Sequence, residues 1–353
     1  MNYSRRSTKI CHLLVWVMSF FIWWVLFNPL AVAAVPDLPA VVGEAAIVID
    51  AETGNVLGSK NPDLKLPIAS TTKIMTALLA LENGHLADRV TLSEEAALQE
   101  GSSMYTSPGE SYTLEELLYG LMLNSGNDAA WALAEHIAGS VPDFVAQMNT
   151  RAQELGAVNT HFTNPSGLPD PDHYSTAHDL ALIAKAAMAR EDFRRIAATK
   201  AQNVPWPVKE TDKLLVNHNK LLWRYEGADG IKTGYTNQAR QCLVASATRD
   251  GQRLIAVVLK SEGENVWSDA QRLLDWGFTN FSTTLLVHSG DQFGTIPVKR
   301  GEIDKIVATA DRDLKATLPK ESVDLVQAVV QELPASLTAP VDKGQILGKV
   351  VFT

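Results

Sequence analysis

The chain has 353 residues, which is long for one domain and comfortable for two. Its composition, with 46% hydrophobic and 20% charged residues, is that of an ordinary globular protein with a sizeable core. The formal net charge of -9 excludes a nucleic-acid-binding function, because a phosphate binder needs a basic face, and we expect no nucleic acid partner.

The first 34 residues have the anatomy of a secretory signal peptide. Two arginines and a lysine precede an almost wholly apolar run over residues 10–27, and Ala31-Val32-Ala33 offers small residues for a cleavage site. The run is also near the lower limit for a membrane span, so an uncleaved anchor is the alternative. In both cases we expect an exported protein, in the cell wall or periplasmic space, that associates with a membrane only through this segment.

Disulfide and metal chemistry are not expected. Once a signal peptide is removed, Cys242 is the one cysteine left, and its apolar, strand-like surroundings predict a buried thiol. The histidines at 161, 173 and 178 lie in or beside a proline-rich loop and lack the spacing of a helical zinc site. We therefore predict no metal site.

Hydrophobic periodicity and turn residues predict the elements of the mature chain. In chain order they are a hairpin of strands 45–50 and 55–59, helices 70–82, 114–123, 128–138, 143–155 and 179–189, strands 230–235, 241–248 and 253–260, and a helix over 266–278.

Helices therefore separate an N-terminal hairpin from C-terminal strands that also pair as hairpins. Because hairpins join antiparallel neighbours, we expect an α/β (α+β) fold, with helices flanking an antiparallel sheet whose first and last strands meet. From about Thr283, short alternating segments between Gly, Pro and charged turns replace the helical pattern. The sequence thus predicts one domain over 35–282 and a small all-β domain over 283–353.

Ser70 and Lys73 stand three residues apart at the start of a predicted helix, in IASTTKIMTALLALE. A serine hydroxyl is a poor nucleophile at neutral pH and needs a neighbouring base. Positions i and i+3 share a helix face, and burial near other cations lowers the pKa of a lysine so that it can accept a proton. A capping serine beside a surface lysine has the same sequence. We expect Ser70 both to cap its helix and to act as a nucleophile.

Two further motifs follow along the chain. Ser125-Gly126-Asn127 lies between two apolar helical runs, where a hydroxyl and an amide can relay a proton and hold a substrate amide, or where a simple turn can form. Lys232-Thr233-Gly234 closes a strand and offers a cation and a hydroxyl for a carboxylate. Gly234 there allows a substrate backbone to approach closely.

The order S-x-x-K, S-x-N, K-T-G is that of penicillin-binding proteins and class A β-lactamases. Together with LMLNSGNDAA, FTNPSGLPDPDHYSTAHDLA and GADGIKTGYT, it makes residues 37–353 resemble the low-molecular-mass penicillin-binding proteins, the D-alanyl-D-alanine carboxypeptidases. The resemblance implies a serine β-lactamase/DD-peptidase-like domain, followed by the small all-β domain, and a hydrolase that acts on peptidoglycan in the cell wall.

The resemblance also implies an acyl-transfer cycle without metal or organic cofactor. Ser70 would attack the carbonyl between the two terminal D-alanines of a peptidoglycan stem peptide, and Lys73 would take its proton. The backbone N–H groups of Ser70 and Tyr235 would form the oxyanion hole, and Ser125 would help to pass a proton to the departing D-alanine. Water would hydrolyse the acyl-enzyme, and β-lactams would acylate Ser70 as covalent inhibitors.

The remaining motif residues are implied to bind substrate. Asn127 would hold the substrate amide, Lys232 would supply positive potential, and Thr233 would bind the terminal carboxylate, beside Gly234 and Tyr235. Many relatives carry an arginine that associates with this carboxylate, and Val266 stands at that position here. Either Lys232 and Thr233 suffice, or another cation such as Lys260 contributes.

Three other functions share part of this pattern. A DD-endopeptidase that cuts cross-links would use the same residues. A serine β-lactamase would hydrolyse penicillin with the same motifs, but class A enzymes use a glutamate in an E-x-x-L-N string, which is absent between residues 140 and 225. A non-catalytic cell-wall binding protein has no physical need for all of the motif residues. The pattern therefore disfavours the last two functions. We expect the carboxypeptidase, and the endopeptidase stays open as the alternative.

Overall fold

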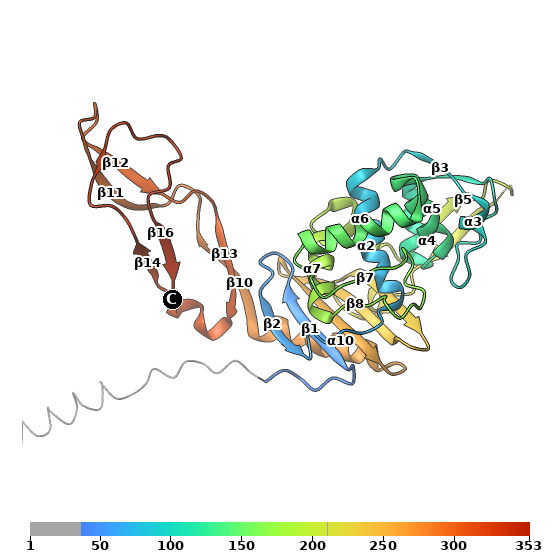
Figure 1. Ribbon diagram of the computed structural model, residues 1–353. Coiled ribbons are helices and arrows are strands. Elements are labelled where there is room, and N and C mark those ends of the chain that lie inside the picture. Colours follow the sequence, from blue (N-terminus) through green and yellow to red (C-terminus); the bar gives the residue numbers. More distant parts are fainter. Residues whose placement is uncertain (1–36, 210) are drawn as a thin grey trace, which may run out of the picture.

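The structure is a computed structural model that describes residues 37–209 and 211–353 (Figure 1). The predicted signal peptide or anchor over residues 1–34 lies outside the described residues. Among those described, no helix combines the length and the apolar character that a membrane span requires. In Figure 1 the helices gather at one end of the molecule, and the strands that follow residue 281 extend away from them.

A five-stranded antiparallel sheet lies at the centre of the larger part. In spatial order its strands are β2 (Val56–Lys60), β1 (Ala45–Asp50), β9 (Gln252–Ser261), β8 (Arg240–Arg249) and β7 (Ala228–Thr236). β1 pairs directly with β9, so the N-terminal hairpin joins the C-terminal strands as predicted. β7 ends the order and pairs with β8 alone among the strands of this sheet.

β1 is buried on both faces, which explains why its sequence AAIVID is apolar up to the final Asp50. Successive side chains of a strand point to opposite faces. Ile47 and Ile49 belong to the core beneath most of the helices, whereas Ala46 and Val48 belong to the core beneath α10 (Asn265–Asn280). The strand thus contributes to both hydrophobic cores.

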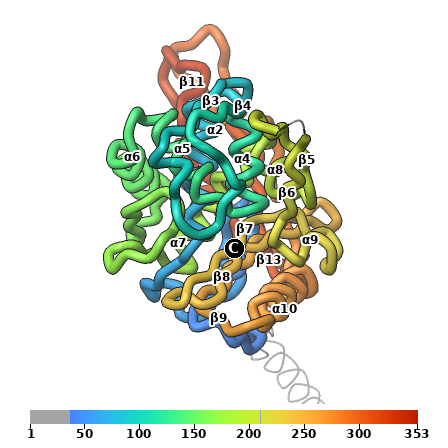
Figure 2. The backbone as a smooth tube through the Cα atoms, turned by 90° about the vertical axis from the view of Figure 1, so that its right-hand side faces the viewer, coloured from blue at the N-terminus to red at the C-terminus, as the bar shows by residue number. Residues whose placement is uncertain are grey.

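Helices cover both faces of the sheet (Figure 2). α10 packs on one face, against β8 and β9, and α7 packs against β9 and β1 from the other. The helix α2 is buried over residues 73–81, between α4, α5 and α7. The helices besides α10 are α2 (Lys73–Asn83), α3 (Glu94–Ala97), α4 (Leu114–Leu123), α5 (Asn127–Ala138), α6 (Val141–Glu154), α7 (Ala177–Met188), α8 (Glu191–Ala198) and α9 (Leu221–Arg224).

Several short elements of this part were not predicted. β3 (Arg89–Thr91) pairs with β4 (Ser111–Thr113), and β5 (Ala201–Pro205) forms a hairpin with β6 (Asp212–Val216). Both pairs pack against helices, as do α3 and α8, while α9 packs against β7. Such short strands and helices are marginal by themselves and form because neighbouring elements bury them. Local periodicity therefore gives them no clear signal.

The C-terminal part is all-β apart from one short 3-10 helix, η2 (Lys320–Leu325), which confirms the predicted class of this segment. Its strands pair as β10 (Phe281–Val287) with β13 (Leu314–Pro319), β11 (Gln292–Lys299) with β12 (Lys305–Thr309) and β15 (Leu337–Thr338), and β14 (Ala328–Gln331) with β16 (Lys349–Phe352).

A buried carboxylate joins the two parts. Asp50, at the end of β1, accepts hydrogen bonds from Thr283 Oγ1 of β10 (2.6 Å) and from Thr53 Oγ1 (3.1 Å), and Thr53 also contacts Thr317 Oγ1 of β13 (2.8 Å). Burial alone would raise the pKa of Asp50, but these hydrogen bonds lower it below its usual value. The ionised Asp50 thus ties the sheet to the C-terminal strands.

Replacing Ile47 by alanine will test the role of β1 in the core. Because Ile47 is fully buried, the Ile47→Ala variant should lose about 2–5 kcal/mol of unfolding free energy. Urea denaturation measures the loss. The exposed Val56 of the neighbouring strand provides the control, and Val56→Ala should cost less than about 1 kcal/mol. Equal losses in the two variants would contradict this account of the core.

Candidate active site

Ser70 lies in a short 3-10 helix, η1 (Ala69–Thr72), directly before α2. The prediction that Ser70 caps its helix is wrong, because α2 begins at Lys73 and Thr72 occupies the N-cap position without a side-chain hydrogen bond. Ala69 adopts a φ of +47°, a left-handed conformation that is uncommon for a residue other than glycine. Ser70 is partly exposed while the two residues after it are fully buried. The turn thus leaves the Ser70 side chain accessible.

The Lys73 amine lies among three oxygen atoms. Lys73 Nζ is 3.0 Å from Ser70 Oγ, 2.7 Å from Asn127 Oδ1 and 2.6 Å from the carbonyl oxygen of Ser166. Its side chain is fully buried. The structure therefore brings the predicted serine–lysine pair into contact, and it adds a backbone carbonyl that the sequence did not indicate.

Two buried lysines, Lys73 and Lys232, lie close enough for the charge of Lys232 to affect the pKa of Lys73. Burial lowers the pKa of Lys73 well below its usual value, and the nearby positive charge of Lys232 lowers it further, while Asp128 opposes the shift. Burial also lowers the pKa of Lys232 to about 7. The site therefore favours the neutral, proton-accepting form of Lys73.

Ser125 lies on the turn between α4 and α5, and Asn127 is the first residue of α5. Asn127 accepts a hydrogen bond from Lys73 and donates one from Nδ2 to the Glu100 carbonyl (2.5 Å). Ser125 is buried and has a positive φ of 61°. Within the part of the chain that the structure describes, the Ser125 hydroxyl forms no hydrogen bond with Ser70 or Lys73. The structure thus places Asn127, but not the Ser125 hydroxyl, in contact with the pair.

The third motif lies on β7, at the edge of the central sheet. Lys232 is buried, Thr233 is half-buried and Tyr235 is 54% exposed. A Cβ atom at Gly234 would lie 3.0 Å from the backbone nitrogen of Ser70. In the structure the backbone that approaches Gly234 closely is that of η1, and close approach by a substrate stays a prediction.

Val266 stands where the resemblance implies an arginine for the substrate carboxylate, and its side chain carries no charge. Val266 is buried in the core between α10 and the sheet. Lys260, the other cation considered, forms an ion pair with Glu44 (2.8 Å). Neither side chain therefore adds an unpaired cation to the site.

The loop over residues 161–174 supplies the third contact of Lys73. Asn164 Oδ1 accepts hydrogen bonds from the backbone N–H groups of Ser166 (3.2 Å), Gly167 (2.7 Å) and Leu168 (3.1 Å). This folding of the loop onto one side chain fixes the direction of the Ser166 carbonyl. The 161–174 loop is thus part of the site, although only its likeness to relatives singled it out in the sequence.

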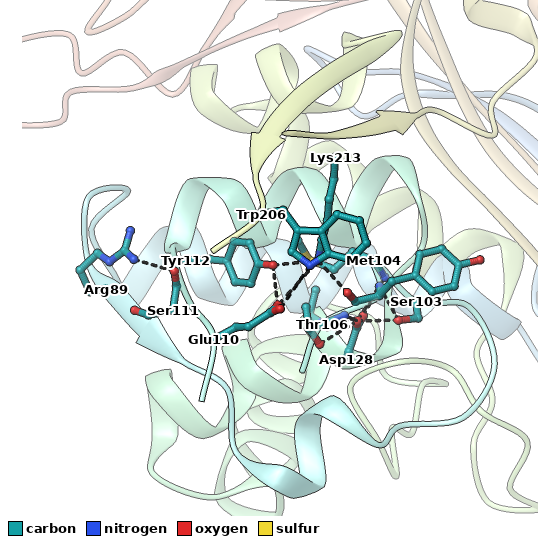
Figure 3. Close-up of polar contacts among 12 residues, drawn as sticks. Arg89, Ser103, Met104, Thr106, Glu110, Ser111, Tyr112, Asp128, Trp206 and Lys213 are labelled. Atoms are coloured by element: carbon teal, nitrogen blue, oxygen red, sulfur yellow. Dashed lines mark hydrogen bonds and ion pairs between the residues drawn. The ribbon is translucent and has the colours of Figure 1, made fainter. Parts of the chain in front are cut away.

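Asp128, the residue after Asn127, anchors the segment over residues 102–106 (Figure 3). Its carboxylate is fully buried and accepts hydrogen bonds from Ser103 Oγ (2.6 Å), the Met104 N–H (3.1 Å) and Thr106 Oγ1 (3.0 Å). The N–H of Asn127 in turn donates to the Ser102 carbonyl (2.7 Å). The segment therefore holds the turn that carries the second motif.

A second anchor of the same segment is a buried lysine of β6 (Figure 3). Lys213 Nζ donates to the Tyr105 carbonyl (2.7 Å) and to Tyr112 Oη (2.8 Å), and it lies 3.7 Å from the Glu110 carboxylate. Trp206 Nε1 donates to the other oxygen of that carboxylate (3.2 Å). The small β5–β6 hairpin thus braces the wall of the site.

The described residues contain no group of three or more His, Cys, Asp or Glu side chains that could hold a metal ion. Cys242 is buried and unpaired, as predicted, and burial raises the pKa of its thiol to about 12.

Fold and site together define a serine hydrolase with a β-lactamase/DD-peptidase-like domain. The family model described as D-alanyl-D-alanine carboxypeptidase matches residues 32–263, and that of the penicillin-binding protein 5 C-terminal domain matches residues 281–353. The chain belongs to the D-alanyl-D-alanine carboxypeptidase family. The family, fold class and enzyme class predicted from the sequence are thereby confirmed.

Individual relatives agree with this assignment. The chain is 38% identical over 318 residues to D-alanyl-D-alanine carboxypeptidase DacF of Bacillus subtilis, covering 88% of this chain and 81% of the relative. It is 42% identical over 257 residues to DacB2 of Mycobacterium tuberculosis, covering 71% and 86%. The crystal structure of penicillin-binding protein 5 from Haemophilus influenzae matches with 35% identity and a TM-score of 0.81, covering 90% of this chain and 94% of that one.

A methyl group at Gly234 will test the contact between β7 and η1. In Gly234→Ala the new Cβ would lie 3.0 to 3.1 Å from backbone atoms of residues 68, 70 and 71, so the strand and the turn must separate slightly. We expect the rate of acylation by a fluorescent penicillin to fall roughly 10–100-fold, since small displacements at a reacting centre are costly. Thermal unfolding should change little, and an unchanged acylation rate would show that the contact is dispensable.

Removing the charge of Lys213 will test whether its buried contact with Glu110 stabilises the protein. Lys213→Met leaves Glu110 buried without its cation and should cost about 3–5 kcal/mol of unfolding free energy, measured in urea. The double variant Lys213→Met/Glu110→Gln removes the unpaired charge and should recover part of the loss. A single variant as stable as the wild type would contradict the role assigned to this pair.

Proposed function

We propose that the chain removes the terminal D-alanine from peptidoglycan stem peptides, as a serine carboxypeptidase that forms an acyl-enzyme on Ser70. The observation that carries the proposal is the buried Lys73 amine, 3.0 Å from Ser70 Oγ and held by two further oxygen atoms. The names of the relatives, D-alanyl-D-alanine carboxypeptidases, support the same substrate. Membership of this penicillin-binding family also supports β-lactams as inhibitors.

The surroundings of Lys73 fit a general base. A neutral amine has two N–H groups and one lone pair. Asn127 Oδ1 and the Ser166 carbonyl are acceptors for the two N–H groups, which leaves the lone pair to accept the Ser70 hydroxyl proton. As this proton moves to Nζ, Ser70 Oγ bonds to the substrate carbonyl carbon.

The negative oxygen that forms in this step needs hydrogen-bond donors. We assign this role to the backbone N–H groups of Ser70 and Tyr235. The close contact between Gly234 and the Ser70 nitrogen supports the assignment, because it brings this end of β7 against η1. Such preorganised donors commonly contribute 10²–10³-fold in rate, roughly 3–4 kcal/mol.

The edge of β7 suits an extended peptide. An extended substrate can add to a free sheet edge through main-chain hydrogen bonds. In this position Asn127 would bind the substrate amide, Thr233 would donate to the terminal carboxylate, and the charge of Lys232 would attract it. Binding of an anion raises the pKa of Lys232 above its value of about 7 and keeps it protonated.

The cycle closes by breaking the C–N bond and then the ester. The proton held by Lys73 passes through the Ser125 hydroxyl to the amine of the departing D-alanine. Water then attacks the Ser70 ester with Lys73 again as base, and the shortened peptide leaves. Penicillin would acylate the same hydroxyl, because its strained amide mimics the scissile bond.

We further propose the domain limits and location predicted from the sequence: export through residues 1–34, a catalytic domain over 35–282 and a small all-β domain over 283–353. The change from helix-flanked sheet to paired short strands near Phe281 supports the boundary. The positive, apolar N-terminus supports export, since the stem peptides of the proposed substrate lie outside the cytoplasm.

D-alanine release from a soluble peptide ending in D-Ala-D-Ala tests the proposal. The protein should release D-alanine, and Ser70→Ala should reduce the rate by about 10³-fold or more. The rate should rise with pH as Lys73 loses its proton, with a midpoint well below the usual pKa of lysine.

A cross-linked peptide and benzylpenicillin serve as competing substrates in the same assay. Labelling of Ser70 by penicillin without D-alanine release would contradict the carboxypeptidase. Cleavage of the cross-link would then indicate an endopeptidase, and rapid turnover of penicillin a β-lactamase.

A further inference from the structure

A buried histidine links the 161–174 loop to the turn that carries Ser70. His173 Nδ1 accepts a hydrogen bond from the Thr163 N–H (3.1 Å), so the ring proton resides on Nε2. Nε2 lies 2.8 Å from Thr72 Oγ1 and donates to it. The ring is almost fully buried and packs edge-on against Phe162.

The link continues to the residue before the nucleophile. Thr72 Oγ1 donates its own proton to the Ala69 carbonyl (2.8 Å), so two consecutive hydrogen bonds join His173 to Ala69. Ala69 is the residue with the left-handed φ of +47°. A strained conformation of this kind persists only where its surroundings hold it.

The same carbonyl is contacted a second time by the 161–174 loop. A Cβ atom at Gly167 would lie 1.9 Å from the Ala69 oxygen, so the loop backbone packs directly on it. The neighbouring Ser166 carbonyl holds the Lys73 amine. One loop therefore contacts both the turn of Ser70 and the base.

We propose that His173 and Thr72 are positioning residues of the hydrolase: through the Ala69 carbonyl they hold the strained turn that directs Ser70 Oγ toward the substrate. This inference rests on the proposed role of Ser70 as nucleophile. Neither residue contacts the substrate in the proposed cycle. Burial lowers the pKa of His173 to about 4, which keeps the ring neutral, and its two hydrogen bonds intact, at neutral pH.

The chain offers a matched pair of threonines for the test. Thr72 and Thr160 are both buried, and the hydroxyl of each makes two hydrogen bonds: Thr160 Oγ1 contacts Ser175 Oγ (2.7 Å) and the Asp179 carboxylate (2.8 Å). Replacing each by valine removes a hydroxyl from the interior with little change in shape. Only Thr72→Val cuts the link to Ala69.

Acylation by fluorescent penicillin and D-alanine release would be measured below the unfolding temperature of every variant. We expect Thr72→Val to lower both the acylation rate and kcat roughly 10–100-fold, with KM within about threefold. Thr160→Val should lose similar thermal stability but keep both rates within about twofold. Thr72→Ser keeps the oxygen atom and should restore most of the activity.

His173→Phe keeps the ring packing and removes both nitrogens, so it should reproduce the loss. The double variant His173→Phe/Thr72→Val should be no slower than Thr72→Val, because both substitutions break one chain of contacts. Wild-type rates in Thr72→Val would overturn the inference without affecting the proposed role of Ser70. If Thr72→Val does not fold, wild-type rates in His173→Phe would overturn the inference in the same way. Absence of any Ser70 labelling in the wild-type protein would overturn the proposed function and this inference with it.

Discussion

Burial of the Lys73 amine is the constraint on which the rest of the site depends. A lysine removed from water loses its preference for the charged form, and its N–H groups must find acceptors within the protein. Here the acceptors come from segments far apart in the chain, the start of α5 and the 161–174 loop. The helical layer must therefore close around α2 before the Lys73 amine has its partners, which ties the proposed chemistry to the packing of the fold.

The same constraint explains the supports around the site. Asn127 can accept from Lys73 because its own amide group and backbone are fixed by the segment over residues 100–106. That segment is held in turn by Asp128 and by Lys213 of the β5–β6 hairpin. Elements outside the three motifs thus determine where the Asn127 oxygen that accepts from Lys73 lies.

Much of this arrangement could be predicted from the sequence. The central strands and most helices follow from apolar periodicity, and Ser70, Lys73, Asn127 and Lys232 stand in motifs with recognisable spacing. Where the local sequence predicts the start of an element wrongly, a tertiary contact determines where the element begins. The start of α2 is one such case, because packing of β7 against η1 and the conformation of Ala69 prevent a regular α-helical turn at Ser70.

Other parts of the site leave no trace in local sequence. The Glu100 and Ser166 groups that complete the site are backbone carbonyls, which every residue possesses. Thr72 and His173 resemble an ordinary helix residue and an ordinary loop histidine until the fold brings them together, 101 positions apart. Their relation to Ser70 is a property of three-dimensional packing, and no spacing rule could supply it.

The use of a backbone carbonyl as a partner of the base also bears on how such an enzyme can change. No single replacement of the Ser166 side chain deletes that acceptor, whereas a replacement of Asn127 can remove its side-chain oxygen. The position of the Ser166 carbonyl depends instead on Asn164, whose side chain accepts the hydrogen bonds that set the path of the loop. A variant selected for slower reaction with penicillin would find a route there, by turning the carbonyl away, without altering any motif residue.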